Sequence, residues 1–202
     1  MTSSPPTEQI LTRRQLDIAR FVNNPACGRG KHTRVLDMGC GPAKWPSAVG
    51  IDHKPYPGVD VVWNLERLPW PLEPGNFDAI LCRDSLEHLE DIVGAMDEFH
   101  RLLAPGGRVI IVTPHVAHPS SFRDPTHKHH FILGTFDYFT GGISYPKYSD
   151  KMFRLVTKGL TFPYRCSIGA VLARWSTARY EKYYAHRWPP HQMFFVLEAV
   201  KP

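Results

Sequence analysis

Val35-Leu36-Asp37-Met38-Gly39-Cys40-Gly41-Pro42-Ala43 is the most informative stretch of the sequence. A short, mostly apolar run of this kind is typical of a buried strand in a parallel sheet. The two glycines that follow allow the backbone to turn sharply and to approach a ligand at the carboxyl end of that strand. Ala43 stands where a third glycine would complete a dinucleotide-binding motif. The stretch therefore predicts a nucleotide-like ligand, and the rest of the chain has to support that prediction.

The overall composition is that of one globular domain. With 202 residues, of which 43% are hydrophobic, the chain is long enough for one well-buried core and short for two. We therefore expect a single domain over residues 1–202, with a polar, Pro-rich and flexible lead-in over residues 1–12. No apolar run approaches the ~18 residues that a membrane-spanning helix needs, and the first residues are unlike a signal peptide. These features predict a cytoplasmic protein without a membrane partner.

Charge is distributed unevenly along the chain, although the net charge is only +5. Residues 1–100 contain 10 Lys and Arg against 14 Asp and Glu, whereas residues 101–202 contain 14 against 5. A basic half is typical of proteins that bind anionic substrates, such as phosphorylated metabolites or nucleic acids. A solvated basic face explains the same composition equally well, so the charge alone selects no partner.

Apolar runs separated by turn residues predict an open, mostly parallel sheet. Only a turn fits between the first two strands, around Lys44-Trp45-Pro46, so the first crossover is shortened and lacks a full helix. Segment 114–150 is rich in Pro, His, Gly and aromatic residues, and a long aperiodic loop is usually functional. Helices are predicted over 13–22 and 167–184, and residues 83–88 are predicted to lead into a third helix that starts near His88 and runs to about Leu103. Strands are predicted over 35–38, 47–51, 59–63, 77–82, 108–113, 151–158 and 192–200.

Polar residues follow the second and third predicted strands. Asp52 lies 13 residues after Gly39, and a carboxylate at a strand end of this kind can accept hydrogen bonds from both hydroxyls of a ribose. Asn64 could contact an adenine edge, although an ordinary turn residue explains it equally well. Together with the glycine turn, these residues predict a bound nucleoside.

Five segments, in order along the chain, resemble the class I S-adenosylmethionine-dependent methyltransferases, specifically the small stand-alone enzymes grouped as type 11. The fold that the resemblance implies is a Rossmann-like α/β open twisted sheet. It is mostly parallel and has seven strands, with 192–200 as the antiparallel closing strand and with the shortened first crossover. The matching segments are 35–41, Gly50-Ile51-Asp52, Phe77-Asp78-Ala79-Ile80, Leu86-Glu87-His88-Leu89 and Leu103-Ala104-Pro105-Gly106-Gly107.

The resemblance also implies S-adenosyl-L-methionine as the cofactor and assigns residues to its parts. The backbone of the glycine turn would line the amino-acid part, with Asp37 supporting the turn. Asp52 and the adjacent His53 would lie at the ribose. Asn64 and Leu65 would flank the adenine, and Arg83 and Asp84 would approach the methionine moiety. The implied cofactor-binding residues are Asp37, Gly39, Cys40, Gly41, Asp52, His53, Asn64, Leu65, Arg83 and Asp84.

The expected function is transfer of a methyl group to an oxygen or nitrogen of a small acceptor, of anionic or sugar-derived type, beneath a cap formed by 114–150. A hydroxyl acceptor needs a general base, and histidine is the commonest one. His88 and His127 are the candidates for that base.

A metal site is an alternative to a simple base. The order Asp84-x-x-Glu87-His88, followed by residues 126–130, is similar in layout to the carboxylate and histidine metal site of some small-RNA 2′-O-methyltransferases. A divalent ion there could lower the pKa of an acceptor hydroxyl. Asp84 replaces the Glu of that layout, however, so we predict no metal from the sequence.

Two other functional classes compete with methylation of a small molecule. Segment 174–188 interleaves cations with aromatic rings, a pattern that binds single-stranded nucleic acid. An amphipathic helix that packs its aromatic side chains on the sheet is the preferred interpretation of that segment, so nucleic acid ranks below a small molecule as the partner. The third class is a cofactor-binding protein without catalysis. The sequence selects neither the acceptor nor an oligomeric state.

Overall fold

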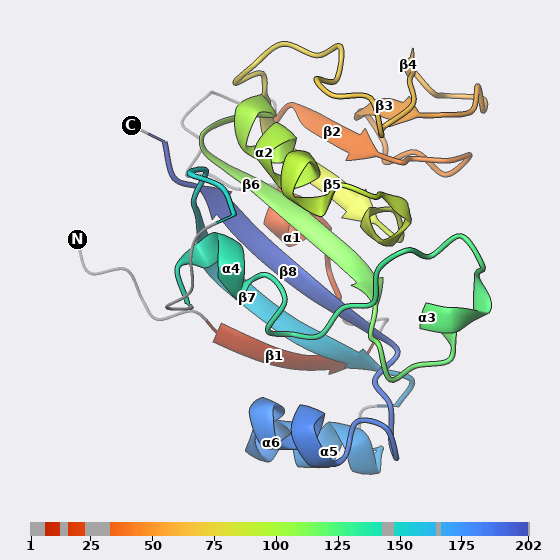
Figure 1. Cartoon of the computed structure of the whole chain (residues 1–202), viewed down its shortest axis with the longest axis vertical. Coiled ribbons are helices and arrows are strands. Elements are labelled where there is room, and N and C mark those ends of the chain that lie inside the picture. Colours follow the sequence, from red (N-terminus) through yellow and green to blue (C-terminus); the bar gives the residue numbers. More distant parts are fainter. Residues whose placement is uncertain (1–6, 13–15, 23–32, 143–147, 165–166, 202) are drawn as a thin grey trace.

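A computed structural model describes residues 7–12, 16–22, 33–142, 148–164 and 167–201 of the chain. At its centre is an eight-stranded sheet with the strand order β1-β7-β8-β6-β5-β2-β3-β4 (Figure 1). Only β8 runs antiparallel to its neighbours, β6 and β7. The strands are β1 (Thr7–Thr12), β2 (Val35–Met38), β3 (Val49–Asp52), β4 (Val61–Val62), β5 (Phe77–Arg83), β6 (Leu103–Pro114), β7 (Phe153–Phe162) and β8 (Gln192–Ala199).

The mostly parallel sheet with an antiparallel closing strand confirms the predicted fold class, and β1 adds an eighth strand to the seven expected. The prediction of a flexible lead-in is therefore wrong for residues 7–12. These residues pair in parallel with β7, from Thr7 opposite Thr157 to Thr12 opposite Phe162. Ile10 and Leu11 pack against opposite faces of the sheet, and β1 covers an edge of β7 that would otherwise present unpaired backbone groups.

Side chains of the central strands alternate between two apolar layers, as the period of a strand requires. Ile80 and Ile111 belong to the layer that includes Met96 and Phe99 of helix α2. Leu81, Ile110 and their neighbours pack on the opposite face with residues of helix α1. Figure 1 shows α2 and α4 on one face of the sheet and α1 on the other. The core strands are therefore fixed on both faces, which holds their carboxyl ends in place.

The helices differ from the predictions where a polar side chain interrupts them. The helix predicted from about His88 to about Leu103 begins later, at Ile92, and a 3₁₀ turn (Leu86–His88) precedes it. The Asp91 side chain accepts a hydrogen bond from Gly94 N and caps this helix, α2. Ser176 likewise separates α5 from α6, since its hydroxyl caps α6. The helices are α1 (Ala19–Val22), α2 (Ile92–Leu102), α3 (Ser120–Arg123), α4 (Asp137–Thr140), α5 (Ile168–Trp175) and α6 (Thr177–Tyr183).

The remaining differences concern the N-terminal helix and the long loop. Helix α1 covers only the last residues of the predicted 13–22, of which 13–15 lie outside the described residues. Segment 114–150 contains the short helices α3 and α4 rather than continuous loop, and its residues 143–147 also lie outside the description. Between β2 and β3 the chain makes turns and no helix, which confirms the shortened first crossover.

Candidate active site and cofactor cavity

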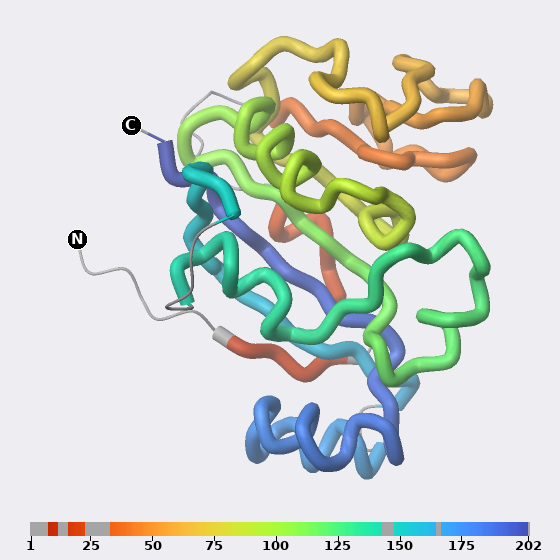
Figure 2. The backbone as a smooth tube through the Cα atoms, viewed as in Figure 1, coloured from red at the N-terminus to blue at the C-terminus, as the bar shows by residue number. Residues whose placement is uncertain are grey.

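The site lies at the topological switch point of the sheet, where consecutive strands are added on opposite sides. Strands β2 and β5 are neighbours, with Met38 opposite Cys82. From this pair the chain continues to β3 and β4 on one side and to β6 on the other. Ligands of open α/β sheets bind at the carboxyl ends of the strands at such a switch point. The glycine turn after β2 and Asp84 after β5 therefore meet at the expected place, which Figure 2 allows the reader to follow along the backbone.

The glycine turn needs glycine for two different reasons. Gly39 and Gly41 both have a positive φ, +63° and +53°, a region that strains side chains with a Cβ. At Gly39 a Cβ would also lie 2.3 Å from Ser85 Oγ, whereas at Gly41 it would meet no atom within 4 Å. The close approach of Gly39 to Ser85 joins the two loops that form the floor of the site.

We expect Gly39→Ala to destabilise the fold more than Gly75→Ala does. Gly75 has a similar φ of +64°, but a Cβ there would meet no atom within 4 Å, so its substitution measures the backbone strain alone, about 1 to 2 kcal/mol. Gly39→Ala adds the overlap with Ser85. Urea unfolding of both variants checks the difference, and equal losses in the free energy of unfolding would show that Ser85 moves aside without cost.

A cavity of about 510 Å³ opens beside the glycine turn, within the range of small-molecule sites. It brings together most of the predicted cofactor-binding residues. Gly39, Gly41, Asp52, His53, Asn64, Leu65 and Asp84 line it, as does the predicted base His88. Its other lining residues are Pro42, Lys54, Tyr56, Glu66, Ser85, Leu89, Thr126 and Lys128.

Asp52 presents a carboxylate that is already held in position. Its side chain is almost fully buried, and Oδ2 accepts a hydrogen bond from Gly41 N at 2.9 Å. Oδ1 accepts one from Lys54 N at 3.0 Å, and Nδ1 of His53 lies 3.1 Å from the same oxygen. Each carboxylate oxygen can accept more than one hydrogen bond, so the Asp52 carboxylate keeps acceptor capacity beyond its two backbone donors.

Three of the predicted residues do not line this cavity. Asp37 is buried, and its Oδ2 accepts hydrogen bonds from Trp45 N at 2.6 Å and from Nη2 of Arg83 at 2.8 Å. Arg83 also donates to the carbonyl of Ala43, so it braces the glycine turn and does not extend to the cavity. Burial raises the pKa of Asp37, although the Trp45 amide and Arg83 oppose that shift. Cys40 lies within the turn with its side chain buried, and it is the third residue outside the lining.

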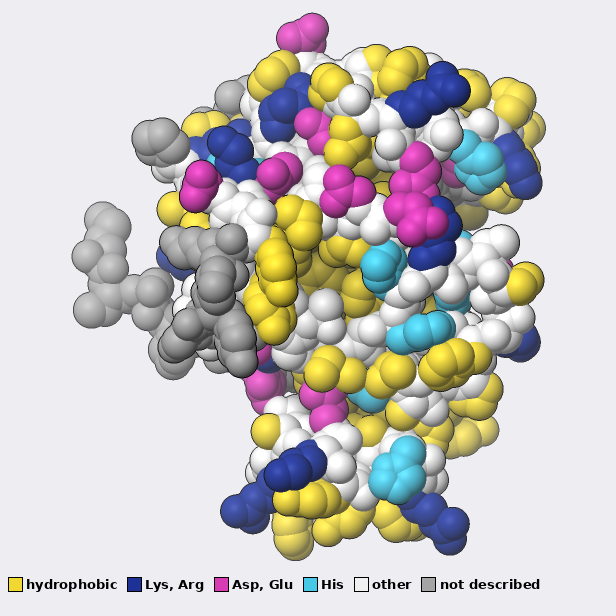
Figure 3. All heavy atoms as spheres, viewed as in Figure 1, with side chains coloured by type: hydrophobic (Ala, Val, Ile, Leu, Met, Phe, Trp, Pro, Cys, Tyr) yellow, Lys and Arg dark blue, Asp and Glu magenta, His cyan; other side chains and the backbone are white. Residues whose placement is uncertain are grey.

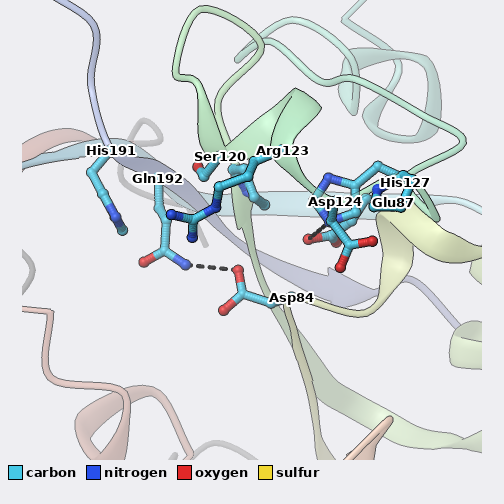
Figure 4. A pocket seen from close by; sticks show the side chains of 10 residues that line it. Asp84, Glu87, Ser120, Arg123, Asp124, His127, His191 and Gln192 are labelled. Carbon is cyan, nitrogen blue, oxygen red and sulfur yellow. Dashed lines mark hydrogen bonds and ion pairs between the residues drawn. The ribbon is translucent and has the colours of Figure 1, made fainter.

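A second cavity, of about 460 Å³, adjoins the first and has a more polar lining. Asp84 belongs to both cavities, and Nε2 of Gln192 donates to its Oδ1 at 2.7 Å (Figure 4). Asp84 has a φ of +47°, and strained backbone of this kind persists where the surroundings hold it. The remaining lining residues are Glu87, Pro114, Ser120, Arg123, Asp124, Pro125, His127, His191 and Gln192.

Glu87 is the most perturbed acid of this second cavity. Burial raises its pKa from 4.5 to about 7. Its Oε2 accepts a hydrogen bond from the hydroxyl of Thr113, and its Oε1 has no hydrogen-bond partner among the residues that the structure describes. The backbone carbonyl of Glu87 accepts from the amides of Lys128 and His129, which fastens the long loop over the 3₁₀ turn. A buried oxygen without a partner indicates a place for a ligand atom.

His127 faces that oxygen. Its Nδ1 lies 2.9 Å from the carbonyl of Ser121, and a carbonyl can only accept, so Nδ1 carries the proton in the neutral ring and Nε2 is the free acceptor. Nε2 lies 4.0 Å from Glu87 Oε1. That separation leaves room for a hydroxyl oxygen within hydrogen-bond distance of both atoms.

His88 lies beside His127 but faces the first cavity. The two rings have centroids 4.7 Å apart, and Nδ1 of His88 is 2.9 Å from the hydroxyl of Thr126, which itself donates to Asp124. Burial lowers the pKa of His88. Glu87, His88 and His127 each offer one atom that could bind a metal ion, and these three atoms lie within 4.8 Å of one another. These three residues could therefore hold a divalent cation, the alternative that the sequence layout raised.

Stability should depend on pH through Glu87. Because the folded state raises the pKa of this carboxyl from 4.5 to about 7, the folded protein keeps a proton that the unfolded chain releases in that window. The free energy of unfolding should therefore fall as pH rises from 4.5 to about 7, by about 3 kcal/mol. Glu87→Gln should remove this part of the slope. Urea titrations at several pH values with a chelator present check it, and an unchanged slope in the variant would contradict it.

Several lining residues carry no signal in the sequence. Arg123, His191 and Gln192 reach the second cavity from segments far apart in the chain. Lys128 rims the first cavity, where its Nζ lies 2.7 Å from Glu66 and 3.1 Å from Glu90. The histidine content of 114–150 was the available indication, and His127 of that segment lines the second cavity. By contrast, His115 pairs with Glu181 and holds α6.

The sequence of this chain is similar to those of known proteins. A methyltransferase-domain model matches residues 10–157. An ubiquinone biosynthesis O-methyltransferase of Pseudomonas aeruginosa is 34% identical over 87 residues, covering 42% of this chain and 36% of that protein. One of the same name from Xylella fastidiosa is 32% identical over 101 residues, covering 40% and 41%. The matches thus span about two fifths of the curated relatives' length.

Solved structures agree on the fold. A S-adenosylmethionine-dependent methyltransferase from Archaeoglobus fulgidus superposes with a TM-score of 0.55 at 16% identity, covering 90% of this chain and 89% of that one. Phosphoethanolamine N-methyltransferase 2 of Haemonchus contortus, solved with S-adenosyl-L-methionine, gives 0.54 at 19% identity, covering 92% and 51%. Fold and cavity thus define a class I methyltransferase. The chain belongs to the methyltransferase-domain family, whose cofactor is S-adenosyl-L-methionine. Within the described ranges, every helix is too short or too polar to cross a bilayer.

Proposed function

We propose that this protein transfers a methyl group from S-adenosyl-L-methionine to a hydroxyl oxygen of a small acceptor bound in the second cavity. The observation that carries the proposal is the shared wall: Asp84 lines both cavities. A cofactor in the first cavity and an acceptor in the second would meet beside this residue. When bound, the cofactor supplies an electrophilic methyl group on a sulfonium.

The residues of the chain have two tasks in this proposal. The first is alignment, which contributes about 7 to 11 kcal/mol when reacting groups are held in the right geometry. Asp52 and the glycine turn would hold the cofactor in the first cavity, and Asp84 would lie where the cofactor meets the acceptor. The second task is removal of the acceptor proton. His127 Nε2 and Glu87 Oε1 face each other across 4.0 Å, so a hydroxyl between them would have a base at hydrogen-bond distance.

The lining supports an oxygen acceptor with an anionic or sugar-derived body. A base is what a hydroxyl needs, and the curated relatives are named as O-methyltransferases. Arg123 and Ser120 lie in the second cavity with the carboxylates of Asp84 and Asp124. An arginine binds carboxylate or phosphate groups, whereas carboxylates accept from hydroxyl groups. The cavity therefore suits a polyhydroxylated or phenolic acid.

Calorimetry and an acceptor screen test the proposal. S-adenosyl-L-methionine and its demethylated product should both bind, and a screen of phenolic acids and sugar acids should find one that is methylated on oxygen. Failure of both compounds to bind would overturn the proposal. Binding without turnover on any acceptor would favour the cofactor-binding protein without catalysis, and turnover only on RNA would favour the RNA-modifying alternative.

His127→Ala should lower turnover by about 10²-fold while leaving the affinity for the cofactor unchanged. The reason is that His127 lines the acceptor cavity and not the cofactor cavity, and a positioned base contributes about 10² to 10⁴ in rate. The matched control is His129→Ala, whose ring contacts the carbonyl of Glu90 and lines neither cavity. Steady-state kinetics with calorimetry separates the two effects, and full activity of His127→Ala would remove this residue as base.

The metal-assisted variant of the same reaction has its own supporting observation, the ligand atoms of Glu87, His88 and His127 within 4.8 Å. An ion there would add a Lewis acid beside the acceptor hydroxyl. Titration of the protein with Co²⁺ provides a readout apart from activity, since a bound ion gives d–d absorption that Glu87→Gln should abolish. Activity unchanged after exhaustive chelation would exclude a metal requirement.

A further inference from the structure

The α5–α6 helix pair exposes its large apolar side chains. On α5 the buried residues are small, Gly169, Ala170 and Ala173, whereas Ile168 and Trp175 are 56% and 86% exposed. Helices of a globular domain normally bury their large apolar side chains. The predicted packing of these aromatic residues on the sheet is therefore wrong for this helix, and only Tyr180 of α6 is fully buried in that way.

The exposed apolar residues form one stripe with an aromatic end. Ile168, Val171 and Trp175 recur at the spacing of a single helix face. Tyr183 and Tyr184 at the end of α6 are also exposed. Figure 1 shows α5 and α6 beyond β1, at one end of the molecule. The stripe thus lies on a projecting part of the surface (Figure 1), and none of its residues lines either of the two cavities.

Cations accompany the stripe, and the acids beside it are hydrogen-bonded: Glu8, which lines a pocket with Trp175, accepts from the hydroxyl of Thr177. Arg179, Lys182 and Arg187 are exposed. The one acid within 167–188, Glu181, is engaged by Nε2 of His115 at 2.9 Å and by the amide of Leu133 at 2.8 Å. Figure 3 shows apolar atoms at this end of the molecule with Lys and Arg side chains on either side. The charge of the surface is therefore complementary to an anionic partner.

The shape and the charge favour a lipid surface over the other anionic or apolar partners. A symmetric contact with a second copy would bring the same cations face to face. Single-stranded nucleic acid binds along a positively charged groove with stacking rings, whereas this surface projects and carries the aliphatic Ile168 and Val171. An interfacial helix combines apolar residues, tryptophan and basic residues in the arrangement found here.

We propose that the α5–α6 pair docks on the surface of a bilayer that contains anionic lipids. The rings of Trp175 and the neighbouring tyrosines enter the headgroup region, and Arg179, Lys182 and Arg187 contact anionic headgroups. The expectation of no membrane partner rested on the lack of a spanning segment, and a helix that lies in the interface needs none. The docking does not depend on the identity of the methyl acceptor.

Co-sedimentation of the full chain with vesicles tests this proposal. The vesicles are phosphatidylcholine alone or with about one third phosphatidylglycerol, at low and high salt. Binding should require the anionic lipid and weaken with salt. Trp175→Ser should reduce partitioning by about tenfold, and Arg179→Ser with Lys182→Ser should remove the preference for anionic lipid. Val62→Ser is the control, because Val62 is 52% exposed on β4 at the opposite edge of the sheet.

Calorimetry with S-adenosyl-L-methionine verifies that each variant is folded. Equal partitioning of the wild type and Trp175→Ser would overturn the proposal, and so would an absence of binding to anionic vesicles. Trp175-dependent binding of single-stranded RNA without vesicle binding would assign the surface to nucleic acid and overturn it. A Trp175-dependent dimer that does not bind vesicles would do the same.

Discussion

Glu87→Gln is expected to lower kcat by about 10² to 10⁴, with little change in the affinity for S-adenosyl-L-methionine. Glu87 lines the acceptor cavity and not the cofactor cavity. Its Oε1 is buried without a hydrogen-bond partner among the described residues, so an acceptor hydroxyl would supply the missing contact. The amide keeps the size of the side chain and its hydrogen bond with Thr113 but removes the basic oxygen.

Two further variants make this expectation specific. Glu73→Gln changes an exposed glutamate outside both cavities and should be as active as the wild type. The double variant Glu87→Gln with His127→Ala should lose little more than the worse single variant, because groups that act as a unit are not additive. Additive losses would show that the two side chains act separately. Full activity of Glu87→Gln would exclude the carboxylate from the reaction.

Asp52→Asn is expected to weaken cofactor binding by about 100-fold. Hydrogen bonds to a charged group contribute about 1.5 to 3 kcal/mol each, and an unsatisfied donor adds its own cost. The asparagine also turns an NH₂ group towards the amide of Gly41 or that of Lys54, both of which need an acceptor. The affinity loss therefore combines the lost ribose contact with a looser glycine turn, and calorimetry measures the sum.

Asp60→Asn separates these two contributions. Asp60 braces the same part of the chain, since it accepts hydrogen bonds from Gly50 N and from Nζ of Lys44 at 2.7 Å, but it does not line the cofactor cavity. It should lower thermal stability and leave the affinity for S-adenosyl-L-methionine within a few-fold of the wild type. Equal affinity losses in the two variants would mean that Asp52 acts only through the fold.

The sheet was predictable because it depends on local patterns. Apolar runs and glycine turns identify β2, β3, β5 and β6, and the motif order gives the switch point at which the cofactor cavity forms. The edge strand β1 was missed, because a six-residue edge strand has little apolar signal and its partner is distant in the sequence. These residues form a strand because they pair with β7, and their amino-acid composition does not indicate it.

The acceptor cavity was predictable only in part. His127 was selected from its loop, whereas Arg123, His191 and Gln192 reach the cavity through tertiary contacts that no spacing encodes. Burial determines the raised pKa of Glu87, and burial is known only when the fold is known. Arg83 shows the opposite error. Its place at the end of β5 suggested a cofactor contact, but the Arg83 guanidinium donates to the carboxylate of Asp37 beside the turn.

The position of β8 has a kinetic consequence for the nascent chain. β8 follows every other strand in sequence, yet it lies between β6 and β7 in the sheet. β7 and β1 therefore have no site on the sheet until residues 192–199 are available, so the ribosome must release the chain through residue 199 before the sheet can close. Pairings across such long separations slow folding, and the uncovered edge of β6 is open to wrong partners meanwhile. Chaperone dependence of this domain would originate in its strand order rather than in a weak core.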